Sequence, residues 1–319
     1  MPNAVPASTP TPSADPSGGA ARSGLALTHF AGRAGDHNDL AMVGSRQLAE
    51  GLVALLGVEA TIVGSPEPCL SVGWREELDA ALPTLRQMAD RLDRVFRSGR
   101  TPVTASSRCA VALATLPVVA KHRPDAVVVW FDAHADLNTP ENSTTGYLGG
   151  LAYSGPLGMW DSGLGDGLRA ENAVLVGARD LDPAEQGLVD AGTIALVEVG
   201  PSMADELRAV IDGRPVYVHI DCDVLDAGTV PTDYRVPDGM SLADLNATTV
   251  VLAESELVGI EVGELESADD PHTPPSYVAA LLDALAPLLS VEVPRPALDP
   301  VCPFNVNALN AHRHERAPR

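Results

Sequence analysis

Residues 126–136 read AVVVWFDAHAD and residues 216–223 read VYVHIDCD, and these two stretches decide the fold. Each begins with a run of β-branched and aromatic residues and then turns acidic. A half-buried strand alternates apolar and polar residues, whereas an apolar run is typical of a strand buried on both faces. The two stretches therefore predict inner strands of a parallel sheet that helices cover on both sides.

Similar runs, predicted as further strands, lie at residues 26–30, 59–63, 172–180, 193–199 and 256–264. The segments between them predict helices. Residues 76–98 place apolar side chains at spacings of three and four, the helical period, at Leu78, Leu82, Leu85, Met88, Leu92 and Val95. Ser241 precedes an acidic turn and predicts a helix N-cap. This alternation of strands and helices indicates an α/β fold, with ligands bound at the carboxyl ends of the strands.

The chain of 319 residues carries 43 acidic and 21 basic side chains, a net charge of −22. Such a charge repels phosphate backbones and anionic lipid, so we expect neither nucleic acid nor a membrane surface as a partner. We expect a cation or a small molecule instead. The sequence has no spanning apolar run and no secretory signal, which predicts a cytoplasmic protein.

Composition divides the chain into three parts. Residues 1–22 are mainly Pro, Ser, Ala and Gly and are predicted to be a disordered leader. Residues 23–293 form the predicted α/β domain. Residues 294–319 are rich in Pro and end in AHRHERAPR, which we interpret as a solvated tail rather than a metal site.

The two decisive stretches end in residues that a core strand should avoid. Spaced two apart, they form two trios: Asp132, His134 and Asp136, and His219, Asp221 and Asp223. Because side chains two apart on a strand share a face, each trio points to one side of the sheet. Carboxylates there repel one another and are costly to desolvate, which favours a divalent cation such as manganese, or a pair of them. The alternative is that they are strand-end caps or salt-bridge partners.

Further acidic residues follow two other predicted strands. Glu264 follows the strand at 256–264, while Asp180, Asp182 and Glu185 precede a predicted helix. Acidic residues at helix starts are commonly caps, which is our interpretation of Asp180. Together these residues predict a bowl of carboxylates that favours a guanidinium or amine substrate.

The order DAHAD, GARDLDPAE, HIDCDVLD and GIEVGELE resembles the ureohydrolases, and within them the arginase branch, over about residues 25–290. The resemblance implies a three-layer α/β/α fold with an eight-stranded parallel sheet. It also implies a binuclear Mn²⁺ cluster and hydrolysis of a guanidinium carbon by a metal-bridging hydroxide.

The resemblance also assigns roles to individual residues. The implied metal ligands are Asp132, His134, Asp136, Asp221 and Asp223, of which Asp132 and Asp221 would bridge the two ions. Glu264 would orient the guanidinium. Asn138 and Thr145 match positions that hold an α-carboxylate, and Asp182 and Glu185 match positions that hold an α-amino group. These four imply an α-amino acid substrate. We predict Asp136, Glu264 and His219 as catalytic residues.

Three positions depart from the family pattern. Cys109, in the segment SSRCA, stands where a GGDHS-like motif supplies a ligand histidine. Thiolate matches manganese poorly, so one metal site should be weak, altered or empty; alternatively Cys109 is a buried residue with no ligand role. Gly149 replaces a histidine thought to protonate the leaving amine. His219 stands where serine is usual, and either takes over part of that role or is a hydrogen-bonded strand histidine.

With cysteine at position 109, the chain resembles a specialised arginase-like branch that acts in antibiotic biosynthesis. Enzymes of that branch cleave N-omega-hydroxy-L-arginine to hydroxyurea and L-ornithine. We expect that reaction here, because a hydroxyguanidine is less basic than a guanidine and its hydrolysis needs less electrostatic help. The alternatives are an ordinary arginase, another guanidino-acid hydrolase, or a degenerate ureohydrolase that only binds ligands. The family resemblance further implies a homotrimer or homohexamer.

Overall fold

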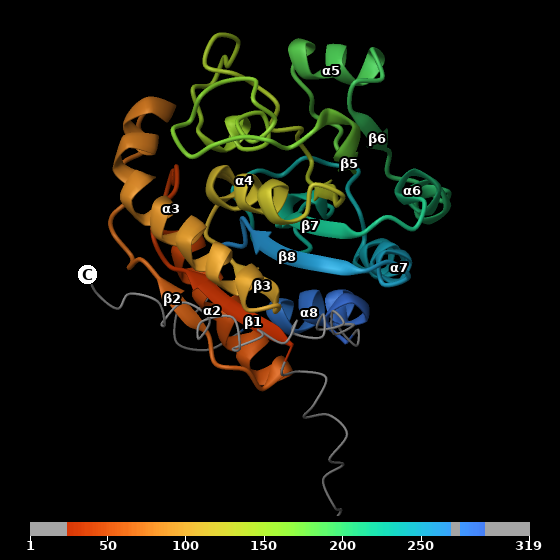
Figure 1. Ribbon diagram of the computed structural model, residues 1–319, viewed down its shortest axis with the longest axis horizontal. Coiled ribbons are helices and arrows are strands. Elements are labelled where there is room, and N and C mark those ends of the chain that lie inside the picture. The colour runs from red at the N-terminus through yellow and green to blue at the C-terminus, as the bar shows by residue number, and fades with distance from the viewer. Residues whose placement is uncertain (1–23, 269–274, 291–319) are drawn as a thin grey trace, which may run out of the picture.

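The computed structural model describes residues 24–268 and 275–290. Its centre is an all-parallel sheet of eight strands in the order β2-β1-β3-β8-β7-β4-β5-β6 (Figure 1). The strands are β1 (Leu25–Phe30), β2 (Thr61–Val63), β3 (Thr101–Ala105), β4 (Val127–Phe131), β5 (Ala173–Val176), β6 (Ala195–Val197), β7 (Val216–Asp221) and β8 (Leu257–Gly263). The predicted eight-stranded parallel sheet is confirmed.

In the part of the chain that the structure describes, seven helices cover this sheet: α2 (Leu40–Leu56), α3 (Trp74–Arg97), α4 (Ala112–His122), α5 (Pro183–Asp190), α6 (Met203–Ile211), α7 (Leu242–Leu252) and α8 (Ser276–Leu289). Within the described residues, α2, α6, α7 and α8 share one apolar cluster with the sheet. Helices α3, α4 and α5 pack on the opposite face (Figure 1). The three-layer α/β/α arrangement is therefore confirmed.

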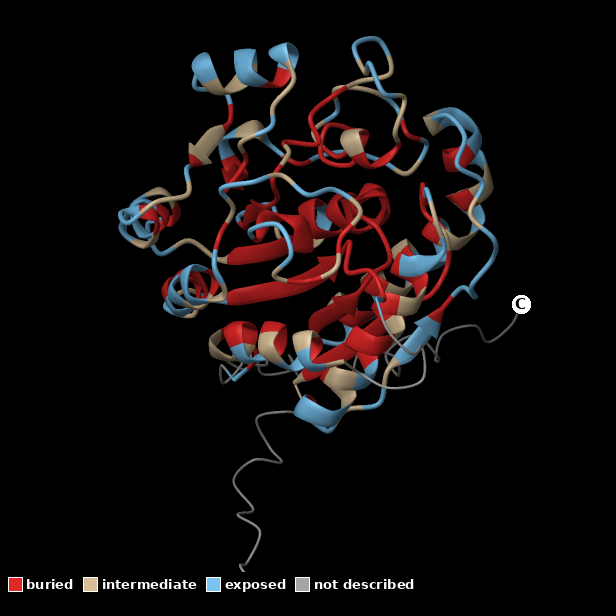
Figure 2. Ribbon diagram, turned by 180° about the vertical axis from the view of Figure 1, so that it is seen from behind, coloured by how far each residue is buried: buried red, intermediate tan, exposed pale blue. Residues whose placement is uncertain are grey.

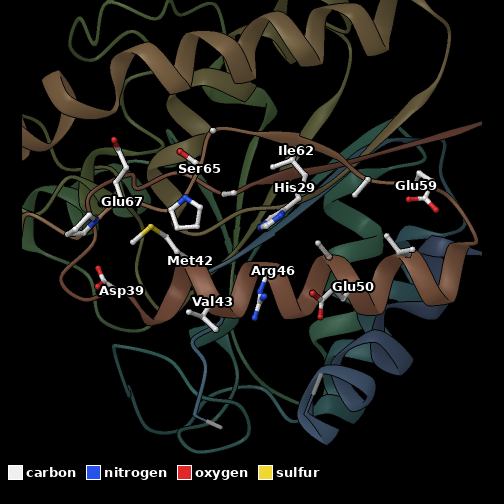
Figure 3. Close-up of a pocket in the computed structure, with 17 residues that line it drawn as sticks. His29, Asp39, Met42, Val43, Arg46, Glu50, Glu59, Ile62, Ser65 and Glu67 are labelled. Atoms are coloured by element: carbon white, nitrogen blue, oxygen red, sulfur yellow. The ribbon is translucent and has the colours of Figure 1, made fainter. Parts of the chain in front are cut away.

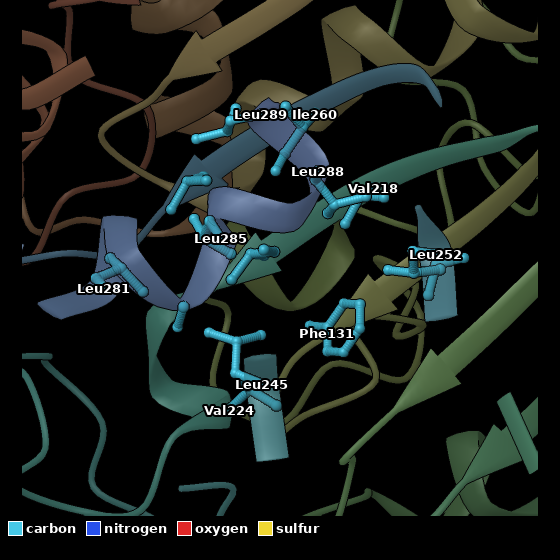
Figure 4. Packing of buried hydrophobic residues seen from close by; sticks show 14 of the residues in the cluster. Phe131, Val218, Val224, Leu245, Leu252, Ile260, Leu281, Leu285, Leu288 and Leu289 are labelled. Carbon is cyan, nitrogen blue, oxygen red and sulfur yellow. The ribbon is translucent and has the colours of Figure 1, made fainter. Parts of the chain in front are cut away.

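The two-sided burial of β4 explains its apolar run. Val127, Val129 and Phe131 face the layer of α7 and α8, whereas Val128 and Trp130 face the α4 side. Figure 2 shows the inner strands as buried throughout, while the helices bury one face and expose the other. Figure 4 shows leucines of α7 and α8 packed near Phe131, Val218 and Ile260. Each strand end is thereby held between two packed layers.

Strand β3 was missed among the strands predicted from the sequence. It lies between β1 and β8, and Pro102 pairs in register with Ala26. Proline has no N–H to donate to a ladder, so a proline in a short run argues against an inner strand. Here the strand forms in spite of Pro102, because it pairs with β1 and every residue of Thr101–Ala105 is buried.

The predicted helix signals are confirmed with small shifts in their limits. The helix predicted at 76–98 is α3, although its interior contains Pro83. Ser241 is the N-cap of α7: its hydroxyl accepts from the Asp244 N–H at 3.1 Å. The cap of α5 is Asp182 and not Asp180, so the capping role predicted for Asp180 was wrong.

Both predicted end segments, 1–22 and 294–319, lie outside the described residues, and the division into parts stays a prediction. Between 24 and 290, apart from the gap at 269–274, no helix is long and apolar enough to cross a membrane. The order of the sheet places β3, β8, β7 and β4 side by side at its centre. Their carboxyl ends therefore bring the acidic segments of the sequence together.

Candidate metal centre and substrate cavity

The ends of β4 and β7 are joined through His134. Its Nδ1 lies 3.2 Å from Asp132 Oδ1 and 3.2 Å from Asp223 Oδ2. Backbone N–H groups fix both carboxylates: His134 N donates to Asp132 Oδ1 at 2.7 Å, and Ala133 N donates to Asp223 Oδ1 at 3.1 Å. The two trios of the sequence thus meet across adjacent strands.

Cys109 begins a short 3₁₀ turn after β3 and faces the same carboxylates. Its Sγ lies 3.2 Å from Asp221 Oδ2, and the residue is buried. Two groups offer ligand atoms within 4.8 Å of one another: Cys109 with Asp132 and Asp221, and Asp132 with His134 and Asp223. Asp132 belongs to both groups, an arrangement that suits two adjacent cations sharing one carboxylate.

The electrostatics of these groups fit a cation. Burial, reinforced by Asp223, raises the pKa of Asp132 to about 6. Burial and neighbouring carboxylates also raise the pKa values of Asp136 and Asp221 well above their usual range. Burial acts to lower the pKa of His134, but its two carboxylate partners raise it to about 12. A divalent cation would relieve this repulsion and replace the His134 proton.

His219 lies behind this centre and has both ring nitrogens engaged. Its Nε2 is 3.1 Å from Cys109 Sγ, and its Nδ1 is 2.8 Å from Glu261 Oε1. Trp130 stacks on the imidazole with a centroid distance of 3.5 Å. The structure therefore favours the hydrogen-bonded strand histidine, because the ring is buried and is not among the residues that line the cavity. The catalytic role predicted for His219 stays a prediction.

A cavity of about 180 Å³ opens above the carboxylates. Nine of the predicted site residues line it: Cys109, His134, Asp136, Asn138, Thr145, Asp182, Glu185, Asp221 and Glu264. Asp132, Asp223 and His219 lie outside its lining. Asp136 and Glu264 both have left-handed backbone conformations, with φ of 52° and 60°. Non-glycine residues in the left-handed region are uncommon, and they cluster at functional sites.

One wall of the cavity is the start of α5. Glu185 accepts the N–H of Asp182 at 2.8 Å and that of Leu137 at 2.9 Å, and Asn138 Nδ2 donates to Asp182 Oδ2 at 2.9 Å. The side-chain amide oxygen of Asn138, Oδ1, is buried without a partner in the described chain. The capping contacts therefore also fix a polar wall, and a free acceptor is left on it.

Glu264 is held by two donors on the opposite wall. Cys109 N donates to Oε1 at 2.7 Å, and Arg108 Nη1 lies 2.7 Å from Oε2. Arg108 was not singled out from the sequence. An arginine beside Cys109 carries no periodic signal, because its partners lie more than 70 positions away in the chain.

The family model for the arginase family matches residues 35–285. An N(omega)-hydroxy-L-arginine amidinohydrolase from Streptomyces lavendulae is 38% identical over 265 residues, covering 83% of this chain and 97% of the relative. The chain belongs to the arginase family. It is accordingly a hydrolase that acts on amidines, in a family that depends on metal.

Two other members of the arginase family are less similar to this chain. The arginase of Bacillus caldovelox is 26% identical, covering 65% of this chain and 76% of the relative. The solved arginase of Bacillus cereus has a TM-score of 0.71 at 23% identity and covers 82% of this chain and 97% of that one. This likeness confirms the arginase-like fold.

Tyr147 explains why this member of the arginase family has glycine at position 149. A Cβ on Gly149 would lie 2.3 Å from Tyr147 Cε1. The ring thus fills the space that a side chain at 149 would need. Its hydroxyl oxygen is buried in the cavity wall and has no hydrogen-bond partner among the described residues. Tyr147 and its neighbour in the lining, Tyr234, were missed because isolated tyrosines in loops give no sequence signal.

A larger cavity of about 910 Å³ lies elsewhere, between α2 and β2 (Figure 3). Its lining is mostly apolar and contains none of the candidate ligand groups. Size alone therefore does not identify the active site of this arginase-family chain. The smaller cavity is the candidate active site, because the buried carboxylates, the thiol and the left-handed residues Asp136 and Glu264 converge there.

Proposed function

We propose that the chain hydrolyses N-omega-hydroxy-L-arginine to hydroxyurea and L-ornithine. The observation that carries this proposal is the Cys109 thiol, 3.2 Å from Asp221 Oδ2, inside one of the two ligand groups. The relative named N(omega)-hydroxy-L-arginine amidinohydrolase, matched over most of both chains, supports the same substrate. We further propose a role in antibiotic biosynthesis and a cytoplasmic location.

The donor sets suit two manganese ions of unequal affinity. Asp132, His134 and Asp223 offer hard oxygens and one imidazole, the ligands that manganese prefers. The other set contains the softer Cys109 thiol, whose pKa is raised by burial and by Asp221. A cation must displace that proton, so this position binds more weakly. Asp136 and Asp221 complete the proposed ligands. Bound cations supply the Lewis acidity that activates water at neutral pH.

The chain's own side chains would hold the substrate at both ends. Asp182, Glu185 and the free Oδ1 of Asn138 would face the α-amino group, and Asn138 with Thr145 would border the α-carboxylate. Glu264 orients the amidine end beside Cys109. A cavity of about 180 Å³ admits an extended amino acid and little else. This accounts for a small guanidino acid as substrate.

Proton transfer falls to two residues that line the cavity. Asp136 lines the cavity among the proposed ligands, so its carboxyl group can take up a proton from the attacking water and release it to the leaving nitrogen. Burial raises the pKa of Tyr147, so its hydroxyl stays protonated and acts as a donor. Because Tyr147 fills the place of a histidine side chain at 149, it is the residue best placed to meet the leaving group.

The test is ornithine release from N-omega-hydroxy-L-arginine and from L-arginine, side by side, with manganese supplied. We expect at least a tenfold preference in kcat/KM for the hydroxylated substrate. Equal turnover of both substrates would instead favour the alternative that the chain is an ordinary arginase. Ornithine from neither, with manganese bound, would favour another guanidino acid or a binding protein. Light scattering on the same sample tests the trimer or hexamer that the family resemblance implies.

A further inference from the structure

The guanidinium of Arg108 is buried completely behind the cavity wall. Its Nε lies 3.0 Å from Asp36 Oδ1, its Nη1 2.7 Å from Glu264 Oε2, and its Nη2 3.2 Å from Glu266 Oε1. Asp233 lies further out, at 3.8 Å from Nη1. The interior of the protein thus contains a charged guanidinium that is held by ion pairs.

Only one of these partners reaches the substrate cavity. Glu264 lines it, whereas Asp36, Glu266 and Arg108 itself do not. Arg108 therefore influences a ligand chiefly through Glu264, the cavity residue that it binds directly. That carboxylate already has a donor on each oxygen, Cys109 N on Oε1 and Arg108 Nη1 on Oε2. A ligand that binds Glu264 must therefore share carboxylate oxygens that already accept a hydrogen bond from Cys109 N or Arg108 Nη1.

We propose that Arg108 is a positioning residue that sets the charge of the ligand group accepted by Glu264. A second full guanidinium on this carboxylate would share Glu264 with Arg108, while Asp36 and Glu266 bind Arg108 outside the cavity lining. The two cations would then repel each other across one shared anion in a poorly solvated wall. An uncharged amidine-type group donates a neutral N–H to the same oxygen without that repulsion. The site therefore disfavours a strongly basic guanidine and favours a neutral group, or a less basic one that gives up its proton more easily, such as an N-hydroxyguanidine.

The location of Arg108 in the sequence agrees with this role. In the segment SSRCA, Arg108 occupies the position that the GGDHS-like motif fills with an acidic residue. A change from acid to arginine reverses the charge next to Glu264. Asp36 and Glu266 compensate the guanidinium from the far side, so that it stays buried and charged. The inference rests on the proposed function for its substrate, but its mechanism concerns ligand charge alone.

The experiment compares two amino acids of nearly equal shape, L-arginine, whose end group is a cation, and L-citrulline, whose end group is a neutral urea. Calorimetry on the manganese-loaded full chain gives the ratio of their dissociation constants. We expect Arg108→Gln to shift this ratio at least tenfold in favour of L-arginine. Arg108→Lys keeps the charge and should leave the ratio within about threefold of the wild type. An unchanged ratio in Arg108→Gln overturns the proposal.

A second variant acts in the opposite direction. Glu266→Gln removes compensation from the far side of Arg108 and should shift the ratio further against L-arginine. A purely structural role would move both variants the same way, as would general loss of stability. If Arg108→Gln does not fold, Glu266→Gln alone decides, and a shift towards L-arginine or no shift overturns the proposal.

Turnover separates this inference from the proposed function. If hydroxyarginine is cleaved but the charge preference does not respond to Arg108→Gln, the role of Arg108 is wrong and the proposed function stands. If the preference responds but no ornithine forms from hydroxyarginine, the proposed function fails and the role of Arg108 stands. In variants that turn over, the change should appear in KM for L-arginine rather than in kcat for hydroxyarginine.

Discussion

The Cys109 thiol and the His219 imidazole lie 3.1 Å apart, Sγ to Nε2, in the buried layer beneath the substrate cavity. Glu261 holds the other ring nitrogen at 2.8 Å and also accepts from Tyr217 Oη at 2.9 Å. The cysteine is therefore the end of a hydrogen-bonded chain that begins in β7 and β8. Groups behind a ligand orient it and tune its strength as a donor.

Glu261→Gln should weaken manganese binding at the Cys109 position by 10-fold or more. The glutamine keeps the size but removes the charge that fixes His219, and loss of such a partner typically costs about 10–100-fold in metal affinity. A calorimetric titration with manganese measures the affinity of this position. Tyr217→Phe is the matched control, since it removes a bond to Glu261 without touching His219. Equal affinity in Glu261→Gln and the wild type would contradict the prediction.

Cys109→Ala should remove most binding of one manganese equivalent and leave the other. The first ligand group loses its thiol, whereas Asp132, His134 and Asp223 remain intact. Elemental analysis after dialysis counts the bound metal. Cys222→Ala serves as the control, because Cys222 is also a buried free thiol but packs in the apolar cluster below the sheet. Two equivalents retained in Cys109→Ala would support the alternative of a buried cysteine without a ligand role.

The sequence predicted the parts of the fold and site that periodicity and motif spacing carry. The apolar runs before Asp132 and Asp221 specified inner strands, and the strand ends placed their carboxylates together. Pro102 concealed a strand, because a missing N–H is tolerated only in a context that the sequence does not reveal. Arg108 and Glu261 were missed for a different reason. Their roles depend on partners brought together by the fold, and neither stands in a spaced motif.

His29 should make the fold sensitive to mild acid. Burial, followed by the charge of Arg46, lowers its pKa to about 4, while the ordinary value is 6.5. Between these values the unfolded chain binds a proton that the folded chain excludes, so stability falls as the pH drops from 6.5 to 4. The loss reaches up to about 3 kcal/mol at 1.36 kcal/mol per pKa unit. Urea unfolding of wild type and His29→Gln at pH 7 and pH 5 measures it.

The variant His29→Gln should lose much of this pH dependence, since glutamine does not titrate and can still reach Ser45 Oγ, now 3.1 Å from the imidazole. The urea m-value should stay the same in both proteins, which shows that only stability has changed. Parallel pH profiles for wild type and variant would rule out His29 as the source of the acid sensitivity.

Tyr147→Phe should reduce kcat by about 10²–10⁴-fold, the usual contribution of a positioned proton donor. Folding should be unharmed, because the hydroxyl has no partner among the described residues and its removal leaves no acceptor unpaired. The expected signature is therefore a large kinetic loss at unchanged or slightly raised thermal stability. Steady-state kinetics on hydroxyarginine and a thermal melt of the same sample provide both values.

Tyr153→Phe gives the converse result and completes the test. Its hydroxyl is also buried but donates to the Val128 carbonyl oxygen at 3.0 Å, away from the cavity lining. Removing it should cost about 1 kcal/mol of stability and leave kcat close to the wild-type value. If Tyr147→Phe instead loses stability and keeps its kcat, the tyrosine only fills the space beside Gly149, and the proton for the leaving nitrogen comes from Asp136 alone.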